Sequence, residues 1–150
     1  LDGARAPQAV SSTLQLANKG FYSGLACHRL TTSGIFVLQC GDPKGDGTGG
    51  PGYSYGPIEN APANNLYKTG VIAMARQGNN ASSQGSQFFI VYSDSTIPSD
   101  SAGGYTVIGS ITSGLDKLIA KVTSKGTSNG SSDGAPKVST KIDSFNILPN

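Results

Sequence analysis

Residues 25–42, LACHRLTTSGIFVLQCGD, are the stretch of sequence that decides the fold. Two apolar runs, at 25–30 and 35–39, flank the cluster TTSG at 31–34, and small polar residues ending in a glycine are favoured in tight turns. The pattern predicts a β-hairpin in which the two runs pair as antiparallel strands.

Symmetric pairing about that turn predicts which residues face each other. It sets Leu30 opposite Val37 and, in the same register, Cys27 opposite Cys40, the only two cysteines of the chain. Facing cysteines favour a disulfide and hence an oxidising compartment. Such a bridge would add about 3 kcal/mol to the free energy of unfolding, as an upper figure. The alternative is a Cys-His-Cys metal site with His28, which offers three ligands and no fourth.

The arginine of the first run needs a partner or a cleft. A guanidinium cannot shed its charge and is almost never fully buried alone. No acidic residue lies between positions 25 and 40, and Asp42 is the nearest along the chain. The hairpin also brings His28, Arg29 and Gln39 together among apolar neighbours. From the hairpin alone, Arg29 is either a surface residue on an edge strand or part of a cleft.

Length and composition indicate one globular domain that spans residues 1–150. A chain of 150 residues and 15.3 kDa can bury about 70% of its unfolded surface, so it needs no staple to fold. It has 21 glycines, 8 prolines and only 13% charged residues, as in loop-rich proteins. Its β-branched and aromatic runs favour a mainly β architecture.

The charge pattern does not favour binding to nucleic acids or to anionic membranes. The formal net charge is +2, and the eleven lysines and arginines are scattered without a basic run, so nucleic-acid or anionic-membrane binding is not expected. No apolar stretch approaches the ~20 residues that span a bilayer, and the N-terminus has no signal-peptide pattern. The chain can still be a mature, processed form.

The rest of the chain alternates short regular segments with polar loops. Helical spacing predicts helices at 5–20 and 113–122, the second with Ser113 and Asp116 arranged as a capping box. Residues 124–136 are rich in Gly, Ser and Asn, and we expect a loop without function. Alternating apolar residues predict strands at 71–75, 86–92, 105–112 and 138–148, the last with a bulge. Together these segments predict a closed antiparallel β-barrel capped by two α-helices.

Residues 43–57 hold too many glycines and prolines for regular structure. A formal G-x-G-x-x-G begins at Gly45, but Pro51 follows it and no helix opens there, so a dinucleotide site is not expected. Asp42 and Asp46 suggest calcium, yet no acidic residue follows at the closing position of the loop. We therefore expect neither a cofactor nor a metal.

Several collinear motifs resemble one known family. The sequence is similar to the cyclophilins, which are peptidyl-prolyl cis/trans isomerases, over nearly its whole length. The matching motifs are CHRL at 27–30, FVLQCGD at 36–42, GTGGPG at 47–52, MA at 74–75, GSQFFI at 85–90 and YTVIG at 105–109. The resemblance implies a cyclophilin-like barrel that binds proline-containing peptides and unfolded proteins, uses no cofactor, assists protein folding and acts as a monomer.

The resemblance also implies roles for individual residues. Arg29, Gln87 and Phe89 resemble the catalytic set, and Phe36, Met74 and Phe89 resemble the walls of the proline pocket. The other residues implied in substrate binding are Gln39 at the polar rim, Ala75 and Arg76 along the peptide backbone, Ile97 in the pocket, and His28 and Tyr105 at its edge. The alternative is a non-catalytic module that holds proline-containing segments in the same groove, as a chaperone or surface interaction module.

Departures from the family pattern carry further expectations. Cys27 and Cys40 stand where most members have an aromatic residue and a glycine, as in secreted or envelope cyclophilins of actinobacteria, so we expect an extracytoplasmic protein. Thr96 stands where cyclosporin-sensitive members carry tryptophan, so we expect weak cyclosporin binding. The family's first strand would precede Leu1 and is absent from this sequence, so either the barrel is not fully closed or the chain is trimmed.

Overall fold

The fold is mainly β with two α-helices, as expected. A computed structural model describes residues 1–148. The helices are α1 (Pro7–Asn18), α2 (Leu115–Lys121) and the short 3-10 helix η1 (Thr123–Lys125). The strands are β1 (Cys27–Thr31), β2 (Val37–Cys40), β3 (Leu66–Tyr67), β4 (Val71–Met74), β5 (Phe88–Val91), β6 (Ser95–Thr96), β7 (Val107–Ser110) and β8 (Asp133–Gly134).

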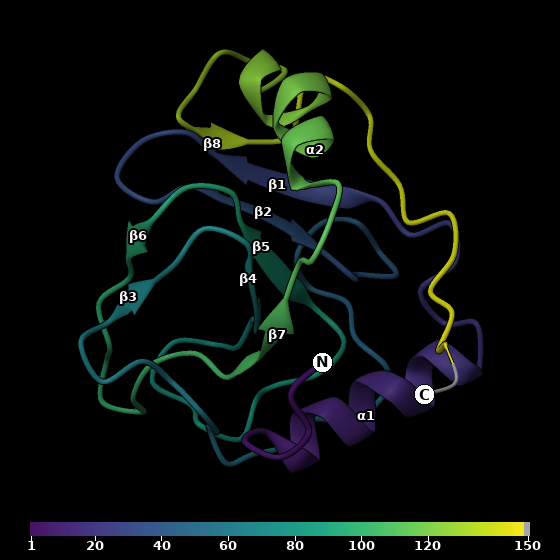
Figure 1. Ribbon diagram of the computed structural model, residues 1–150, viewed down its shortest axis with the longest axis vertical. Helices are drawn as coiled ribbons and strands as arrows, with labels where there is room; N and C mark the ends of the chain where they lie inside the picture. The colour runs from purple at the N-terminus through teal and green to yellow at the C-terminus, as the bar shows by residue number, and fades with distance from the viewer. Residues whose placement is uncertain (149–150) are drawn as a thin grey trace.

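Six of the strands form one antiparallel sheet. Their order is β7-β4-β5-β2-β1-β8, and β3 pairs with β6 in a separate two-stranded ribbon. Figure 1 shows α1 at one end of the molecule and α2 at the other, with the sheet between them. The predicted closure into a barrel is not confirmed, because β7 and β8 are the two end strands of the described sheet and do not pair with each other. At the β7 edge, the Asp2 N–H donates to the Ile108 carbonyl at 2.8 Å.

The predicted hairpin is formed by β1 and β2, but its register shifts by one residue. Cys27 lies opposite Cys40 and forms the expected disulfide with it. Beyond that pair, Leu30 faces Leu38 rather than Val37, because two residues of β1 oppose one residue of β2 at His28. Such an extra residue is a β-bulge, and it changes the face to which the following side chains point.

The bulge determines the direction of the arginine. In a regular strand Cys27 and Arg29 would point to the same face, since side chains alternate with a period of two. With His28 as the extra residue, Cys27 packs with Leu30 in one cluster while Arg29 lies opposite Gln39 on the other face. The bulge therefore places the guanidinium on the face opposite the buried disulfide.

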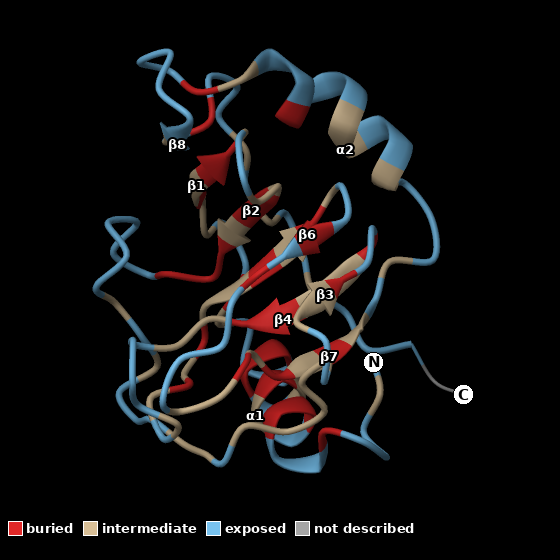
Figure 2. Ribbon diagram, turned by 90° about the vertical axis from the view of Figure 1, so that its left-hand side faces the viewer, coloured by how far each residue is buried: buried red, intermediate tan, exposed pale blue. Residues whose placement is uncertain are grey.

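Alternation along the strands divides the core between the two faces of the sheet. Val37, Ala73 and Phe89 pack in one cluster together with Ile97. Their neighbours in sequence, such as Met74, belong to clusters on the other face. Figure 2 shows the buried residues concentrated in the strands and on the side of α1 that faces them.

Helix α1 covers the second face. Pro7 stands in its first turn, where a missing N–H costs nothing, and Ala9 and Val10 are buried against Met74 and Ile108. Two backbone N–H groups of its first turn donate to the Glu59 carboxylate, at 3.0 and 3.1 Å. A carboxylate is stabilising at this end of a helix.

Helix α2 packs loosely and begins differently from the prediction. None of its residues is fully buried, and its partly buried Leu118 contacts the cluster around the disulfide. The expected capping box of Ser113 and Asp116 is wrong: the N-cap is Gly114, whose φ of 84° lies in the left-handed region, and no side chain caps the helix.

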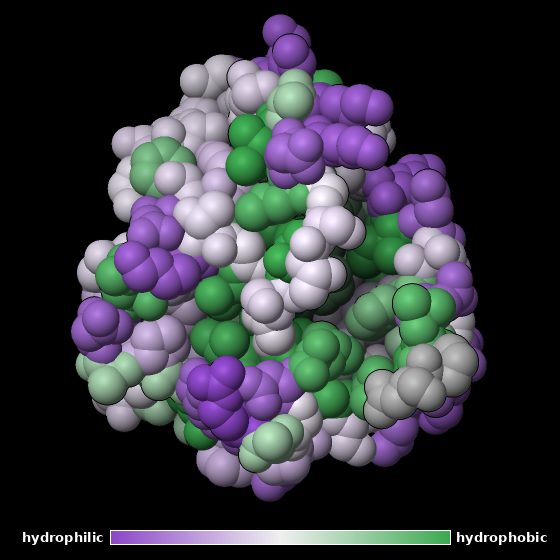
Figure 3. Space-filling view, in the orientation of Figure 1, coloured by the Kyte–Doolittle hydropathy of each residue, from purple (hydrophilic) through white to green (hydrophobic). Residues whose placement is uncertain are grey.

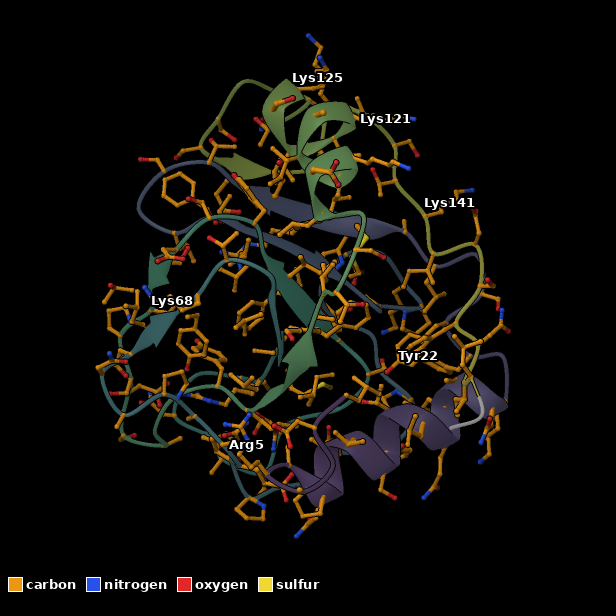
Figure 4. The ribbon with its side chains drawn as sticks, in the orientation of Figure 1. Arg5, Tyr22, Lys68, Lys121, Lys125 and Lys141 are labelled. Atoms are coloured by element: carbon orange, nitrogen blue, oxygen red, sulfur yellow. A yellow bond between two sulfur atoms is a disulfide. The ribbon has the colours of Figure 1, made fainter. Side chains whose placement is uncertain are left out.

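The expected C-terminal strand at 138–148 is wrong as well. That segment forms no regular strand, although it lies antiparallel to residues 24–27 through a bridge between Lys141 and Ala26. Two backbone hydrogen bonds flank the bridge, from the Cys27 N–H to the Thr140 carbonyl and from the Ile142 N–H to the Leu25 carbonyl, both at 2.9 Å. Its apolar residues still pack, since Ile142 and Phe145 contact the buried Tyr22. Figure 4 shows Tyr22 between α1 and this segment. The strand that does form is β8, inside the segment expected to be a plain loop.

None of the helices in the described part of the chain has the length and apolarity needed to cross a bilayer.

Candidate functional site

A small cavity opens on the face of the sheet opposite α1. It measures about 140 Å³, and strands β1, β2 and β5 contribute to it together with the segments that follow β4 and β6. Its lining residues are Arg29, Ile35, Val37, Gln39, Ala75, Arg76, Phe89, Ile97 and Tyr105. Apolar walls with a few polar groups on one side are the usual build of a site for a small apolar group.

Arg29 is one of two arginines that line this cavity, and its guanidinium is held in place. Its Nε donates to Asp133 Oδ1 at 2.8 Å and its Nη2 to Asp133 Oδ2 at 2.7 Å. Nη1 donates to Gln39 Oε1 at 3.3 Å. The hydrogen bonds and the attraction between the charges lower the pKa of Asp133 and raise that of Arg29. The partner that the arginine requires is therefore a residue 104 positions away, in a loop from which no function was expected.

Two glutamines extend this contact across the site. Gln39 Nε2 donates to Gln87 Oε1 at 2.8 Å. Gln87 Nε2 in turn donates to the carbonyls of Gly47 and Gly49, at 3.0 and 2.9 Å. The arginine, both glutamines and the glycine loop thus form one hydrogen-bonded chain.

Asp42 holds the glycine-rich loop at 44–49 in place through hydrogen bonds to its backbone. Its buried carboxylate accepts N–H groups of Lys44, Asp46 and Gly47, at 2.5 to 3.1 Å. Burial opposes its charge, but the backbone N–H groups outweigh it and lower its pKa. A Cβ at position 49 would lie 2.0 Å from Asp42 Oδ1, so only glycine fits there. Asp42 is a structural residue of the loop.

Arg76 lines the cavity, but its guanidinium forms structural contacts with Asp100 and with backbone carbonyls. The side chain is 1% exposed and pairs with both carboxylate oxygens of Asp100 at 2.9 Å. It also donates to three backbone carbonyls, and its guanidinium carbon lies 4.6 Å above the ring of Tyr105. These hydrogen bonds hold the pKa of Asp100 well below its usual range. Of the described arginines, Arg29 is thus the one that presents its charge to the cavity.

His28 lies beside the cavity. It borders a neighbouring depression of about 400 Å³ with Arg29, Gln39 and the loop around Gly47. Burial lowers its pKa, and its Nδ1 has no hydrogen-bond partner among residues 1–148.

Two predicted wall residues do not line the cavity. Met74 is fully buried on the opposite face of the sheet, against α1, so its assignment as a wall is wrong. Phe36 lies between the lining residues Ile35 and Val37 in the sequence. Its ring instead packs edge-on against the Tyr92 ring, with the two ring centroids 5.9 Å apart. Ile35 and Val37 take the place of these two residues.

A second, larger depression adjoins the first. It measures about 430 Å³ and shares Gln39, Ala75 and Arg76 with the cavity. Gln87 and the loop 47–51 contribute to its other walls, and its lining is mostly polar. On the face of the molecule seen in Figure 3, apolar residues lie among near-neutral ones, with hydrophilic residues around them. The cavity and the larger depression therefore adjoin each other along Gln39, Ala75 and Arg76.

Comparison with known proteins points to one family. The family model described as cyclophilin type peptidyl-prolyl cis-trans isomerase matches residues 1–147. A probable peptidyl-prolyl cis-trans isomerase B of Mycobacterium leprae is 41% identical over 158 residues, covering 98% of this chain and 52% of that protein. Its Mycobacterium tuberculosis counterpart is 47% identical over 127 residues, covering 75% of this chain and 39% of that protein. The chain therefore spans about half or less of the length of these relatives.

Two further similarities are to proteins of which this chain covers a larger share. Peptidyl-prolyl cis-trans isomerase B of Bacillus subtilis is 42% identical over 112 residues, which is 74% of this chain and 72% of that protein. A Cryptosporidium parvum cyclophilin-type isomerase, crystallised in the presence of the dipeptide Ala-Pro, superposes with a TM-score of 0.78 at 26% identity. That match covers 99% of this chain and 89% of the other. The mycobacterial similarities agree with the resemblance to actinobacterial proteins.

Proposed function

Because this chain belongs to the family of cyclophilin-type peptidyl-prolyl cis-trans isomerases, we propose that it accelerates rotation about X-Pro bonds in peptides and unfolded proteins. The single observation that carries the proposal is the guanidinium of Arg29 fixed at the rim of a cavity of about 140 Å³ that Val37, Phe89 and Ile97 line.

The reaction asks for positioning rather than for covalent chemistry. Resonance gives the X-Pro bond a rotation barrier of about 20 kcal/mol, so unaided exchange takes roughly tens to hundreds of seconds. In the twisted amide the resonance is lost, and the prolyl nitrogen becomes pyramidal and accepts a hydrogen bond better. A donor fixed near that nitrogen stabilises the twisted form more than the flat one.

Arg29 has donors left for this purpose. A guanidinium carries five N–H groups, and Asp133 and Gln39 occupy three of them. The remaining two have no partner among residues 1–148. Phe89, Val37 and Ile97 would enclose the proline ring, while the remaining N–H groups donate to the prolyl nitrogen.

The size of the arginine's contribution is limited. A charge-assisted hydrogen bond contributes roughly 1.5 to 3 kcal/mol, or one to two decades of rate. The rest of the acceleration has to come from the cavity, which removes water from the amide and holds the ring in place.

The test is the relaxation of an X-Pro tetrapeptide from cis to trans, with and without the protein. We expect a clear acceleration that falls at least tenfold in Arg29→Ala. Arg5→Ala is the matched control, since it removes another arginine that is paired with an aspartate, in this case an exposed one. Peptide binding without acceleration by the unmutated protein would reject the isomerase and select a non-catalytic binding module. A loss of at most a few-fold in Arg29→Ala would reject this mechanism.

We further propose that the protein works outside the cytoplasm, where it assists folding. The disulfide between Cys27 and Cys40 supports this location, because such bonds persist in oxidising compartments. The test is alkylation of free thiols in intact cells, followed by denaturation and a second, heavier reagent after reduction. Both cysteines should be protected from the first reagent. Free thiols at both positions would contradict the proposal.

The same proposal includes weak binding of cyclosporin and activity as a monomer. Thr96 of β6 is exposed and offers no aromatic ring to a large apolar ligand. Titration with cyclosporin should inhibit the wild type weakly, and Thr96→Trp should strengthen the inhibition. Equal inhibition of both proteins would contradict the role assigned to this position.

A further inference from the structure

We propose that Asp133 is a positioning residue that fixes the direction in which the Arg29 guanidinium presents its free N–H groups; this inference rests on the proposed isomerase function. Its two carboxylate oxygens grip one edge of the guanidinium, at 2.8 and 2.7 Å. A bidentate contact of this kind sets the plane and the rotation of the fork, which a single hydrogen bond does not.

Asp133 can do this because its own backbone is held. It lies in β8, which pairs with β1 through Thr31 opposite Asp133 and Leu30 opposite Gly134. Arg29 is two residues from Thr31 on the same strand, so the two side chains form a diagonal cross-strand pair. The Thr32 N–H donates to the Ser132 carbonyl at 2.9 Å, and Ser131 Oγ donates to the Asp133 carbonyl at 2.6 Å.

The exposure of the pair shows that stability is not its main effect. The side chains of Arg29 and Asp133 are 40% and 53% exposed. Ion pairs at this exposure contribute little to the folded state, since water competes and salt screens the charges. Loss of the carboxylate should therefore leave the fold intact and release the guanidinium.

Without Asp133, the arginine would keep one contact, from Nη1 to Gln39 at 3.3 Å. That contact is longer than a good N–H···O bond and leaves the head of the side chain free to rotate. The guanidinium would then spend less time in the orientation that reaches the prolyl nitrogen. The loss should fall on the chemical step, since the apolar cavity that binds the ring is unchanged.

Charge and position predict opposite results for one substitution. The carboxylate partly neutralises the guanidinium, so on charge alone its removal would make Arg29 a stronger donor and speed the reaction. Asp133→Asn keeps the size of the side chain and removes its charge. If Asp133 acts by position, this variant is slower despite its greater positive charge.

The experiment compares kcat and KM for Asp133→Asn, Asp133→Ala and Asp133→Glu with the wild type and Arg29→Ala. We expect kcat to fall about tenfold in the Asn and Ala variants, KM to change less than about twofold, and Glu to recover part of the rate. Asp2→Asn is the matched control: it removes the partner of Arg5, whose Nε donates to Asp2 Oδ2 at 2.6 Å. Arg5 lies beside α1, at the end of the molecule opposite β8 (Figures 1 and 4).

A second readout separates position from structure. In the wild type, the Arg29 Nε–H should give a distinct NMR signal protected from exchange, which disappears in Asp133→Asn while backbone signals elsewhere stay in place. Unchanged or increased kcat in the folded Asn and Ala variants would overturn the proposal, and so would an Arg29 Nε–H signal unchanged by the Asn substitution. If the wild type itself has no isomerase activity, the proposed function fails, and an absent or exchange-labile wild-type Nε–H signal would overturn the positioning role as well.

Discussion

Gln39 lies opposite Arg29 in the ladder between β1 and β2, one step beyond the disulfide and on the other face of the sheet. Its side chain accepts a hydrogen bond from the Arg29 guanidinium and donates one to Gln87, so it connects the small cavity with the larger depression. Gln39→Leu removes both hydrogen bonds with little change in volume. We expect kcat/KM to fall about tenfold, because two or more polar contacts are lost together.

The measurement is the isomerase assay at several peptide concentrations. Gln15→Leu, on the exposed side of α1, is the control for a change from amide to alkyl group. Equal kcat/KM for Gln39→Leu and the wild type would show that the hydrogen-bonded chain has no part in the reaction.

The disulfide should stabilise the fold without taking part in the reaction. It closes a loop of 13 residues, for which the loss of chain entropy predicts about 3 kcal/mol of stabilisation. The hairpin already restrains that loop, so this is an upper figure. Urea unfolding of the double variant Cys27→Ala, Cys40→Ala should show a lower midpoint. An unchanged midpoint and slope would contradict the prediction.

Met74 and Val37 lie on opposite faces of the sheet and should respond differently to truncation. Met74→Ala should lower the free energy of unfolding by about 2 to 5 kcal/mol, as for large buried side chains, and leave KM unchanged. Val37→Ala widens the cavity and should raise KM several-fold, because the proline ring loses packing. The measurements are urea unfolding curves and KM for both variants. A raised KM in folded Met74→Ala would contradict the prediction and show that Met74 lines the cavity.

His28 makes stability depend on pH. Burial lowers its pKa below the ordinary 6.5, while Asp42 opposes that effect. The unfolded chain therefore binds a proton more readily, and the free energy of unfolding should decrease as the pH falls below about 6.5. Urea unfolding of the wild type and His28→Gln between about pH 7.5 and 5 should show a shallower decrease in the variant. Parallel curves would mean that other groups cause the dependence.

The sequence predicted the parts of the fold that depend on local pattern. The turn at 31–34 and the facing cysteines located the hairpin and its disulfide, and apolar spacing located α1 and the central strands. The bulge at His28 has no comparable signal, because one extra residue changes register without changing composition. As a result, Leu30 was placed opposite the wrong partner.

The remaining errors have a common physical origin, since they concern contacts between distant segments. Residues 71–74 are apolar throughout, so they give no phase that tells which face Met74 takes. The two-residue strand β8 has no alternation to recognise, and its Asp133 reaches Arg29 across 104 positions. The need of a strand arginine for a carboxylate was visible in the sequence; the choice among nine acidic residues was not.

The distance between Arg29 and Asp133 along the chain also sets an order of events during synthesis. At roughly 5 to 20 residues per second, a ribosome needs about 5 to 20 seconds to add the 104 residues between them. The last residue that lines the cavity, Tyr105, precedes Asp133 by only 28 residues, which is about 1 to 6 seconds at the same rate. During synthesis, the arginine of the site is therefore made well before the carboxylate that holds it, and the rest of the cavity wall is completed only shortly before that carboxylate.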